Sequence, residues 1–117
     1  MGMFDSLTCE YPLPRPEMQA RTFQTKDLGC ALDYFVIRAS GELFIQTYEI
    51  ERIESPESPL GYRLRRVNEQ WERIDDEHGD VYFYGFERFG DANSPLVTFR
   101  ARFTHGRVES IIESEAA

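Results

Sequence analysis

The sequence predicts one all-β domain, built as an antiparallel meander of six or seven strands in a curved sheet, a sandwich or a small barrel. Three observations support this prediction. Aromatic residues make up 14% of the chain, with nine Phe and six Tyr, and such rings favour strands. From residue 31 onward, short alternating runs are separated by Gly, Pro and Asp. No stretch shows sustained helical periodicity, and only a short helical turn is expected after Pro16.

The chain begins with a proline-rich N-terminal arm over residues 3–30, and the meander follows at residues 31–113. A first short strand ends near Tyr11. The prolines after it keep the chain extended, because each one fixes φ and restrains the residue before it. Residues 22–28 are expected to form a return strand. Residues 1–2 have the form of a cloning scar before a natural start.

The middle of the chain predicts a central hairpin and an edge strand. Residues 34–38 and 43–50 pair around a Ser-Gly turn, and their apolar side chains on both faces predict a position covered on both sides. Residues 51–61 contain two prolines and three glutamates, which is typical of a surface loop. Apolar and basic residues alternate at 62–67, which indicates an edge strand.

Further strands are expected at residues 70–74, 81–86 and 97–104. After the last of these strands the chain turns back at His105–Gly106. With a two-residue turn there, a single register pairs apolar residues on one face and oppositely charged residues on the other. The predicted pairs are Phe103 with Val108, Ala101 with Ser110, Phe99 with Ile112, Arg102 with Glu109, and Thr98 with Glu113.

The formal charge of −8 limits the classes of ligand. Nucleic acid and anionic membranes are not expected as direct partners, because both require clustered Lys and Arg. An acidic surface instead attracts a basic protein, or it only keeps the chain soluble. No long apolar window and no secretory signal pattern is found, so we expect a cytoplasmic protein.

Several stretches carry residues that could perform chemistry, but each has a simpler reading. Asp75, Asp76, Glu77, His78 and Asp80 offer metal ligands or an acid–base site, but a polar turn around Gly79 is the stronger interpretation. His105 also precedes a turn glycine. Cys9 and Cys30 lack the spacing of zinc sites and are expected to be buried free thiols, with a disulfide, a metal site or a reactive thiol as alternatives. We therefore predict no catalytic residue, no metal site, no cofactor and no enzyme activity.

The aromatic and acidic residues are the candidates for partner binding. Tyr82, Tyr84 and Phe86 share one face of their strand, and this face is either an interface or a second buried layer. Two acidic stretches, at 51–57 and 75–77, precede them in the sequence. The residues predicted to bind a partner are Glu51, Glu54, Glu57, Asp75, Asp76, Glu77, Tyr82 and Tyr84.

Four blocks of the sequence together resemble a family of small proteins of unknown function from bacteria, phages and mobile elements. The blocks are MFDSLTCEYPLP at 3–14, FQTKDLGCALDYFVI at 23–37, HGDVYFYGF at 78–86 and FRARFTHGRV at 99–108. The resemblance implies a compact cytoplasmic protein of phage or mobile-element origin and brings no catalytic motif with it.

Our preferred hypothesis is therefore a small acidic, non-catalytic protein-binding module. It would act as an inhibitor of the anti-CRISPR kind, covering a basic, nucleic-acid-binding surface of a host defence protein. Two alternatives remain. One is a β domain that binds a small ligand or a metal, and the other is a structural module that forms a homodimer.

Overall fold

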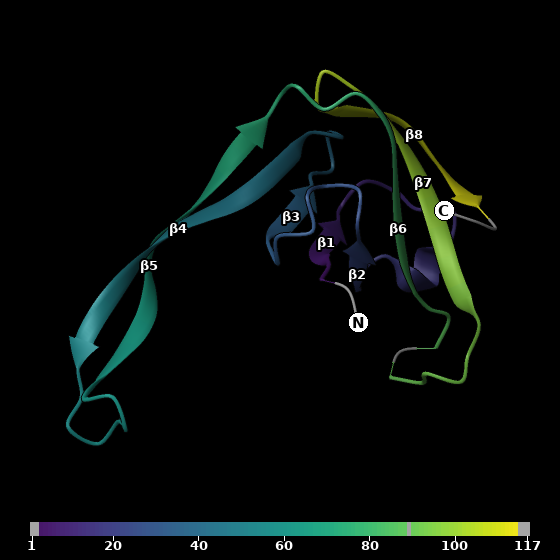
Figure 1. The fold of residues 1–117 in the computed structure, drawn as a ribbon. Helices are drawn as coiled ribbons and strands as arrows, with labels where there is room; N and C mark the ends of the chain where they lie inside the picture. Colours follow the sequence, from purple (N-terminus) through teal and green to yellow (C-terminus); the bar gives the residue numbers. More distant parts are fainter. Residues whose placement is uncertain (1–2, 89, 115–117) are drawn as a thin grey trace.

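The computed structural model describes residues 3–88 and 90–114; residues 1–2, assigned above to a cloning scar, lie outside this range. The described part is nearly all β, which confirms the predicted fold class. It contains one short 3-10 helix and eight strands (Figure 1). Their bounds are β1 (Asp5–Cys9), η1 (Pro16–Met18), β2 (Thr22–Thr25), β3 (Tyr34–Ile37), β4 (Leu43–Glu54), β5 (Tyr62–Ile74), β6 (Gly79–Phe86), β7 (Leu96–Thr104) and β8 (Arg107–Ser114).

The strands form one open sheet in the order β5-β4-β3-β1-β2-β6-β7-β8. Six of the seven pairings in this order are antiparallel, but β1 and β3 are parallel. The structure thus corrects two details of the prediction, since there are eight strands and the sheet is mixed. The parallel pair arises because the chain, after the β1–β2 hairpin, crosses back and adds β3 on the other side of β1.

A buried carboxylate holds this crossover in place. Asp5 is fully buried, and its oxygens accept hydrogen bonds from the backbone amides of Cys30, Ala31 and Asp33 at 2.9–3.0 Å. A carboxylate that accepts several backbone N–H groups is well satisfied in the interior. Asp5 therefore fixes the path by which β3 reaches its parallel position beside β1.

The proline-rich segment between β1 and β2 packs against the chain's own sheet. Leu13 and Met18 are buried in the core, and the Gln19 side chain bonds the backbone of Cys9, Tyr11 and Leu13 at 2.8 Å. The guanidinium of Arg15 also donates to Glu87 and Glu113 at 3.1 and 2.7 Å. The segment closes one side of the core.

The core lies on one face of the curled sheet, where alternate side chains of the strands converge. Its centre is a group of aromatic rings, in which Phe23 contacts Phe83 and Phe99 edge-on with centroids 5.2 and 5.7 Å apart. Phe83 and Phe99 stack at 5.5 Å. Gly85 packs closely beside this group, because a Cβ there would lie 3.2 Å from the Phe23 ring and would require the ring to shift by a few tenths of an ångström.

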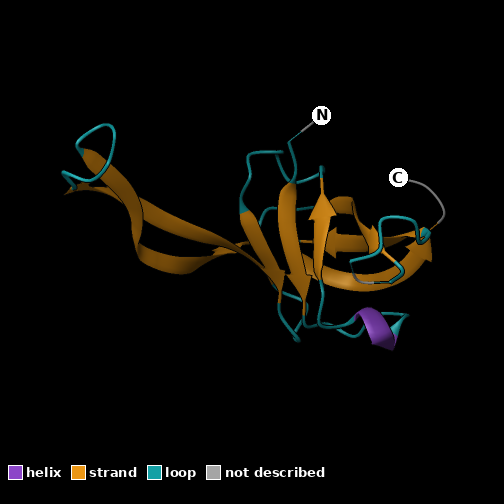
Figure 2. Ribbon diagram, turned by 90° about the horizontal axis from the view of Figure 1, so that it is seen from below, coloured by secondary structure: helices purple, strands orange, loops and turns teal. Residues whose placement is uncertain are grey.

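The β4–β5 hairpin extends well beyond the rest of the sheet (Figures 1 and 2). We call its outer part, residues 48–68, the hairpin arm, and the remaining described residues the body. The principal extents are 50 × 36 × 23 Å, and the radius of gyration is 16.6 Å. A compact chain of this length has a radius of gyration of about 13 Å. The arm accounts for the elongated shape.

The hairpin arm corrects three boundaries predicted from the sequence. Residues 51–54 belong to β4 and are not part of a loop, so the connecting loop is only 55–61. The strands expected at 62–67 and 70–74 are one strand, β5, which is an edge strand as expected. Asn68 has a positive φ of 54° at a bulge, and this local irregularity made one strand look like two.

The last hairpin turns at His105–Gly106 as predicted, and Phe103 faces Val108. The other four predicted pairs are wrong by one residue, because a bulge at Glu109 shifts the register. The observed pairs are Arg102 with Ser110, Ala101 with Ile111, Phe99 with Glu113, and Thr98 with Ser114.

The sheet curls until its two halves meet at one corner. Glu42, just before β4, forms an isolated bridge with Arg107 at the start of β8. The Leu43 amide donates to the Gly106 carbonyl at 2.9 Å. Gly106 also contacts Ile74 so closely that a Cβ at this position would overlap the Ile74 carbonyl. This corner joins the base of the hairpin arm to the β7–β8 turn.

Candidate binding face

One face of the sheet buries its side chains in the core, and the other is not covered by a second layer of the described chain. We call the second the outer face. The predicted cover on both sides of the central hairpin holds only in part, because on this face of β3 Tyr34 is exposed whereas Val36 is buried. Tyr84 and Phe86 alternate with the core residues of β6 and point to this same face. The predicted aromatic face is thus partly exposed, with Phe86 exposed and Tyr82 and Tyr84 partly buried.

A hollow of about 240 Å³ lies on the outer face over β1, β2 and β3. Small hydroxyl residues form its floor, because side chains larger than Ser or Thr are absent from the outward positions of β1. Tyr34, Gln46 and Trp71 form its wall. None of its lining residues is charged; they are Ser6, Thr8, Thr22, Tyr34, Phe35, Gln46 and Trp71.

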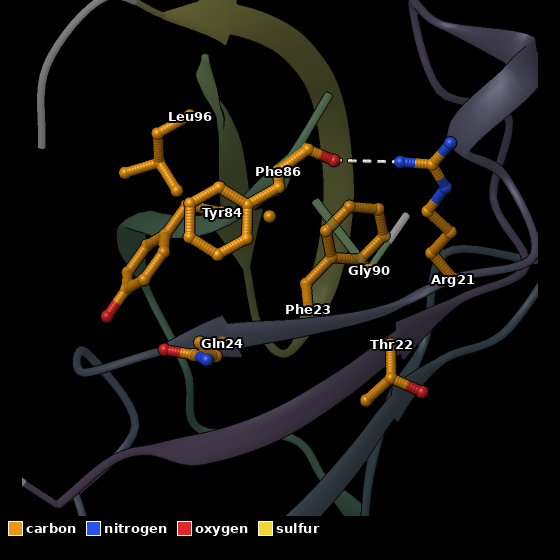
Figure 3. Close-up of a pocket in the computed structure, with 9 residues that line it drawn as sticks. Arg21, Thr22, Phe23, Gln24, Tyr84, Phe86, Gly90 and Leu96 are labelled. Atoms are coloured by element: carbon orange, nitrogen blue, oxygen red, sulfur yellow. Dashed lines mark hydrogen bonds between the residues drawn. The ribbon is translucent and has the colours of Figure 1, made fainter. Parts of the chain in front are cut away.

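A second hollow of about 240 Å³ lies in a notch between β2 and β6. These strands pair only through Gln24 with Tyr84 and Thr25 with Phe83, and then they diverge. Figure 3 shows the Tyr84 and Phe86 rings close together above Gln24. The lining residues are Arg21, Thr22, Phe23, Gln24, Tyr84, Gly85, Phe86, Gly90 and Leu96.

Arg21 is the one charged side chain among these lining residues, and the protein already uses it. Its Nη1 donates to the carbonyl oxygens of Phe86 and Glu87 at 2.8 Å (Figure 3 shows the first of these bonds). It thereby satisfies backbone acceptors where the β2–β6 ladder stops. Since both hollows include Thr22, we treat them as one feature, the trough, with aromatic walls and an uncharged polar floor.

Arginine side chains hold the aromatic wall on the arm side. The Arg66 guanidinium lies 5.6 Å from the Tyr34 ring centre and 4.3 Å from that of Tyr48. Arg38 lies 5.9 Å from the Trp71 ring centre. Cation–π contacts of this kind restrain ring positions even at exposed sites. The wall therefore presents rings that are already oriented before any ligand arrives.

The acidic residues predicted to bind a partner divide into two groups. Glu51 and Glu54 lie on β4 in the hairpin arm, and Glu57 lies in the loop at its tip. Glu51 pairs with Arg65 at 3.1 Å. The arm holds four acidic residues and four arginines, so its formal charge is zero, and the whole excess of −8 belongs to the rest of the chain.

Asp75, Asp76 and Glu77 lie in the connection from β5 to β6, at the top of Figure 1 and far from the arm tip. This connection is not a hairpin turn, because β5 and β6 do not pair. Partial burial raises the pKa of Glu77, and Asp76 adds to this effect. The two acidic groups therefore do not form one continuous patch.

His78 and His105 lie together, which their separate turns in the sequence did not indicate. Their ring centres are 4.6 Å apart and edge-to-face. Within residues 3–88 and 90–114, no group of three or more His, Cys, Asp or Glu side chains is placed to hold a metal ion. The histidine pair is thus a contact between the β5–β6 connection and the β7–β8 turn.

The two cysteines are free thiols in different environments. Cys9 is buried as predicted, and its burial raises the pKa of the thiol to about 12. Cys30 is only partly buried, which corrects the prediction for that residue, and its Sγ lies 3.1 Å from the Lys26 carbonyl oxygen.

Of the predicted aromatic residues, Tyr84 lines the trough and Tyr82 lies on the same face outside it. Sequence reasoning placed Phe86 on the candidate aromatic face but missed Tyr34 and Trp71 as binding candidates. Trp71 was visible as the single tryptophan of the chain, on a strand marked by charged neighbours. Its position beside Tyr34 depends on the β5-β4-β3 order and could not be read from local pattern.

No helix among the described residues is long and apolar enough to span a bilayer. Comparisons with protein-family models, curated proteins and solved structures find no match for this chain.

Proposed function

We propose that this chain is a cytoplasmic, non-catalytic protein-binding module that contacts its partner through the trough on the outer face. The observation that carries this proposal is the uncovered aromatic wall. Trp71 and Phe86 are 41% and 40% exposed on a sheet whose other face holds the core. Large rings left exposed beside shallow hollows are typical of interaction sites.

The composition of the trough supports protein binding. The centres of protein interfaces are enriched in aromatic residues and depleted of charge, and the hot spots among them are often Trp and Tyr. The trough has this composition, although 29% of the whole chain is charged. Charged residues surround it, as they do in the rim of an interface.

The charge distribution favours a partner with a basic surface. The excess of −8 lies outside the hairpin arm and includes Asp75, Asp76 and Glu77. Such a field raises the association rate with a positively charged protein. In this proposal the partner is a host defence protein, and the chain inhibits it by covering its nucleic-acid-binding surface, as anti-CRISPR proteins do.

Affinity capture from a bacterial lysate, followed by mass spectrometry, tests the proposal. Three baits are compared: the wild type, Trp71→Ala in the trough, and Tyr62→Ala on the hairpin arm as a matched aromatic control. We expect a protein with a basic surface that the wild type and the control retain and Trp71→Ala loses. The same proteins on all three baits would contradict binding through the trough.

Kinetic measurements with the purified partner test the electrostatic part. Reversing Asp75, Asp76 and Glu77 to lysine is expected to slow association and reduce its salt dependence, with little change in the dissociation rate. Addition of the wild type is expected to displace nucleic acid from the partner. If nucleic acid stays bound in the complex, the chain is not an occluding inhibitor.

Homodimer formation is a second candidate, favoured by the exposed apolar residues of the hairpin arm. Leu60 and Leu64 are 71% and 62% exposed on an arm without net charge. Two such arms meet without the repulsion that two bodies of like charge would experience. Light scattering over a concentration series, with Leu64→Ser as the variant, decides between a monomer and an arm-mediated dimer.

A further inference from the structure

The trough also indicates what kind of segment the partner presents. We propose that it binds a proline-rich segment in the polyproline II conformation with a basic residue beside the prolines; this inference rests on the protein-binding function proposed above.

The first argument is the form of the trough. Two hollows of about 240 Å³ each follow one another across the sheet and share Thr22. A compact ligand would need one deep cavity, whereas two shallow hollows in series accept consecutive parts of an extended chain. Polyproline II is extended and already ordered before binding, so it loses little conformational entropy in a shallow site.

The second argument is the chemistry of the walls and the floor. Rings stand on both sides, Tyr34 and Trp71 over the first hollow and Tyr84 and Phe86 over the second. Proline-rich segments dock between aromatic side chains of this kind. The flat apolar pyrrolidine ring packs against their faces.

The floor supplies the hydrogen bonds that such a ligand needs. A polyproline II chain makes no internal hydrogen bonds, so its carbonyl groups require donors. The hydroxyls of Ser6, Thr8 and Thr22 can donate, and none of them makes a side-chain hydrogen bond within the part of the chain that the structure describes. The Gln24 amide extends this row into the second hollow.

The third argument is charge. Glu69 accepts a hydrogen bond from the Gln46 amide of the wall at 3.0 Å. Arg66, against the Tyr34 ring, and Arg38, which lies near Trp71 and pairs with Glu10 at 3.7 Å, are basic groups on this side. The described residues outside the arm hold 16 acidic and nine basic side chains, a formal charge of −7, and this excess favours a Lys or Arg beside the prolines.

Trp71 is the only tryptophan, so its fluorescence reports directly on the first hollow. The probe is a short peptide of alternating leucine and proline with an arginine at each end. We expect a saturable change in Trp71 emission. A peptide with every proline replaced by alanine, and one with glutamate at each end, are each expected to bind at least about tenfold more weakly.

Variants locate the site. Tyr34→Ala in the first hollow and Phe86→Ala in the second are each expected to weaken peptide binding at least about tenfold. Tyr62→Ala on the hairpin arm is the matched control and leaves binding unchanged. Circular dichroism verifies that each variant is folded. Glu69→Gln is expected to reduce the preference for arginine-flanked over uncharged peptide, with little effect on the uncharged one.

Several outcomes would overturn the inference. The first is that the proline peptide causes no saturable change in Trp71 emission. The second is that the alanine peptide binds as tightly as the proline peptide. The third is that neutral oligosaccharides change Trp71 emission and the peptide does not. If the peptide fails while a captured protein is still lost in Trp71→Ala, only the ligand class is wrong. If the peptide fails and no protein depends on Trp71, the proposed function fails with it.

Discussion

The body and the hairpin arm are built from the same sheet but are stabilised in different ways. In the body, alternate side chains converge on a core in which Phe83 and Phe99 are fully buried. In the arm, no residue from 48 to 68 is buried. Its strands are joined by cross-strand contacts such as Glu51 with Arg65 and Arg52 over Tyr62.

This difference separates what keeps the chain folded from what it can present to a partner. Isolated two-stranded hairpins are only marginally stable in water, so the arm depends on the body at its base. The body owes little to the arm, because no core side chain comes from it. The trough lies in the body, beside the arm: Trp71 and Gln46 lie at the base of the β4–β5 hairpin, and the floor comes from β1 and β2.

The largest expected effect is the loss of a ring from the core. Phe99→Ala should lower the free energy of unfolding by about 3–5 kcal/mol, because it removes buried area and leaves a cavity beside Phe23 and Phe83. The matched arm variant, Leu64→Ala, should change it by less than about 0.5 kcal/mol. Urea unfolding measures both. Equal effects would mean that the arm and the body share one core.

A smaller loss is expected at the buried carboxylate of the crossover. Asp5→Ala should cost about 2–4 kcal/mol, because three backbone amides lose their acceptor away from water. The arm control is Glu51→Gln, whose exposed pair with Arg65 contributes less than about 1 kcal/mol. Urea midpoints for both variants test this, and an unchanged midpoint for Asp5→Ala would show that the crossover is held by other contacts.

Cys9 gives a pH-dependent test of whether water reaches the interior of the body. Its pKa is raised from 9.0 to about 12 by burial, so stability that is fully present below pH 9 is lost as the pH rises towards 12. The loss approaches about 1.4 kcal/mol per pH unit in that range. In the single variant Cys30→Ser, the free energy of unfolding should fall as the pH rises from 8 to 10. In the double variant, which carries both Cys9→Ala and Cys30→Ser, this fall should be absent.

Alkylation gives the same comparison at a single pH. In a Cys30→Ser chain at pH 8, Cys9 should react only through unfolding, whereas a cysteine introduced by Leu64→Cys should react at the rate of a free thiol. Fast reaction at Cys9 in the native state would show that water reaches this part of the body.

The smallest effect on the body is expected from removing most of the arm. Replacing residues 49–67 by an Asn-Gly turn should change the stability of the body by less than about 1 kcal/mol and keep Trp71 emission native-like. Thermal and urea unfolding measure the change. A shortened chain that does not fold would show that the arm is part of the cooperative unit.

The sequence predicted most of the elements, because the alternation that marks a strand is local. The strands around Tyr34, Tyr84 and Phe99 and the turn at His105–Gly106 were found in this way. The sequence-based prediction failed where one inserted residue shifts the strand register or interrupts the alternation. Glu109 shifts a register and Asn68 divides the pattern of one strand, and neither bulge leaves a distinctive residue pattern.

The candidate site was harder to predict from the sequence than the fold. Tyr84 was identified because its strand is strongly aromatic, but the acidic residues were chosen without their cross-strand partners. Glu51 faces Arg65 across the hairpin, so this candidate for partner binding is paired within the chain.

The sequence by itself determined an all-β chain with a net negative charge, since these are properties of composition and of neighbours along the chain. Only the tertiary structure decided that β3 pairs in parallel with β1, that the excess charge lies outside the arm, and that Tyr34, Trp71 and Tyr84 stand around one trough. The physical reason is that strand order depends on hydrogen bonds and packing between distant segments, which no local pattern specifies.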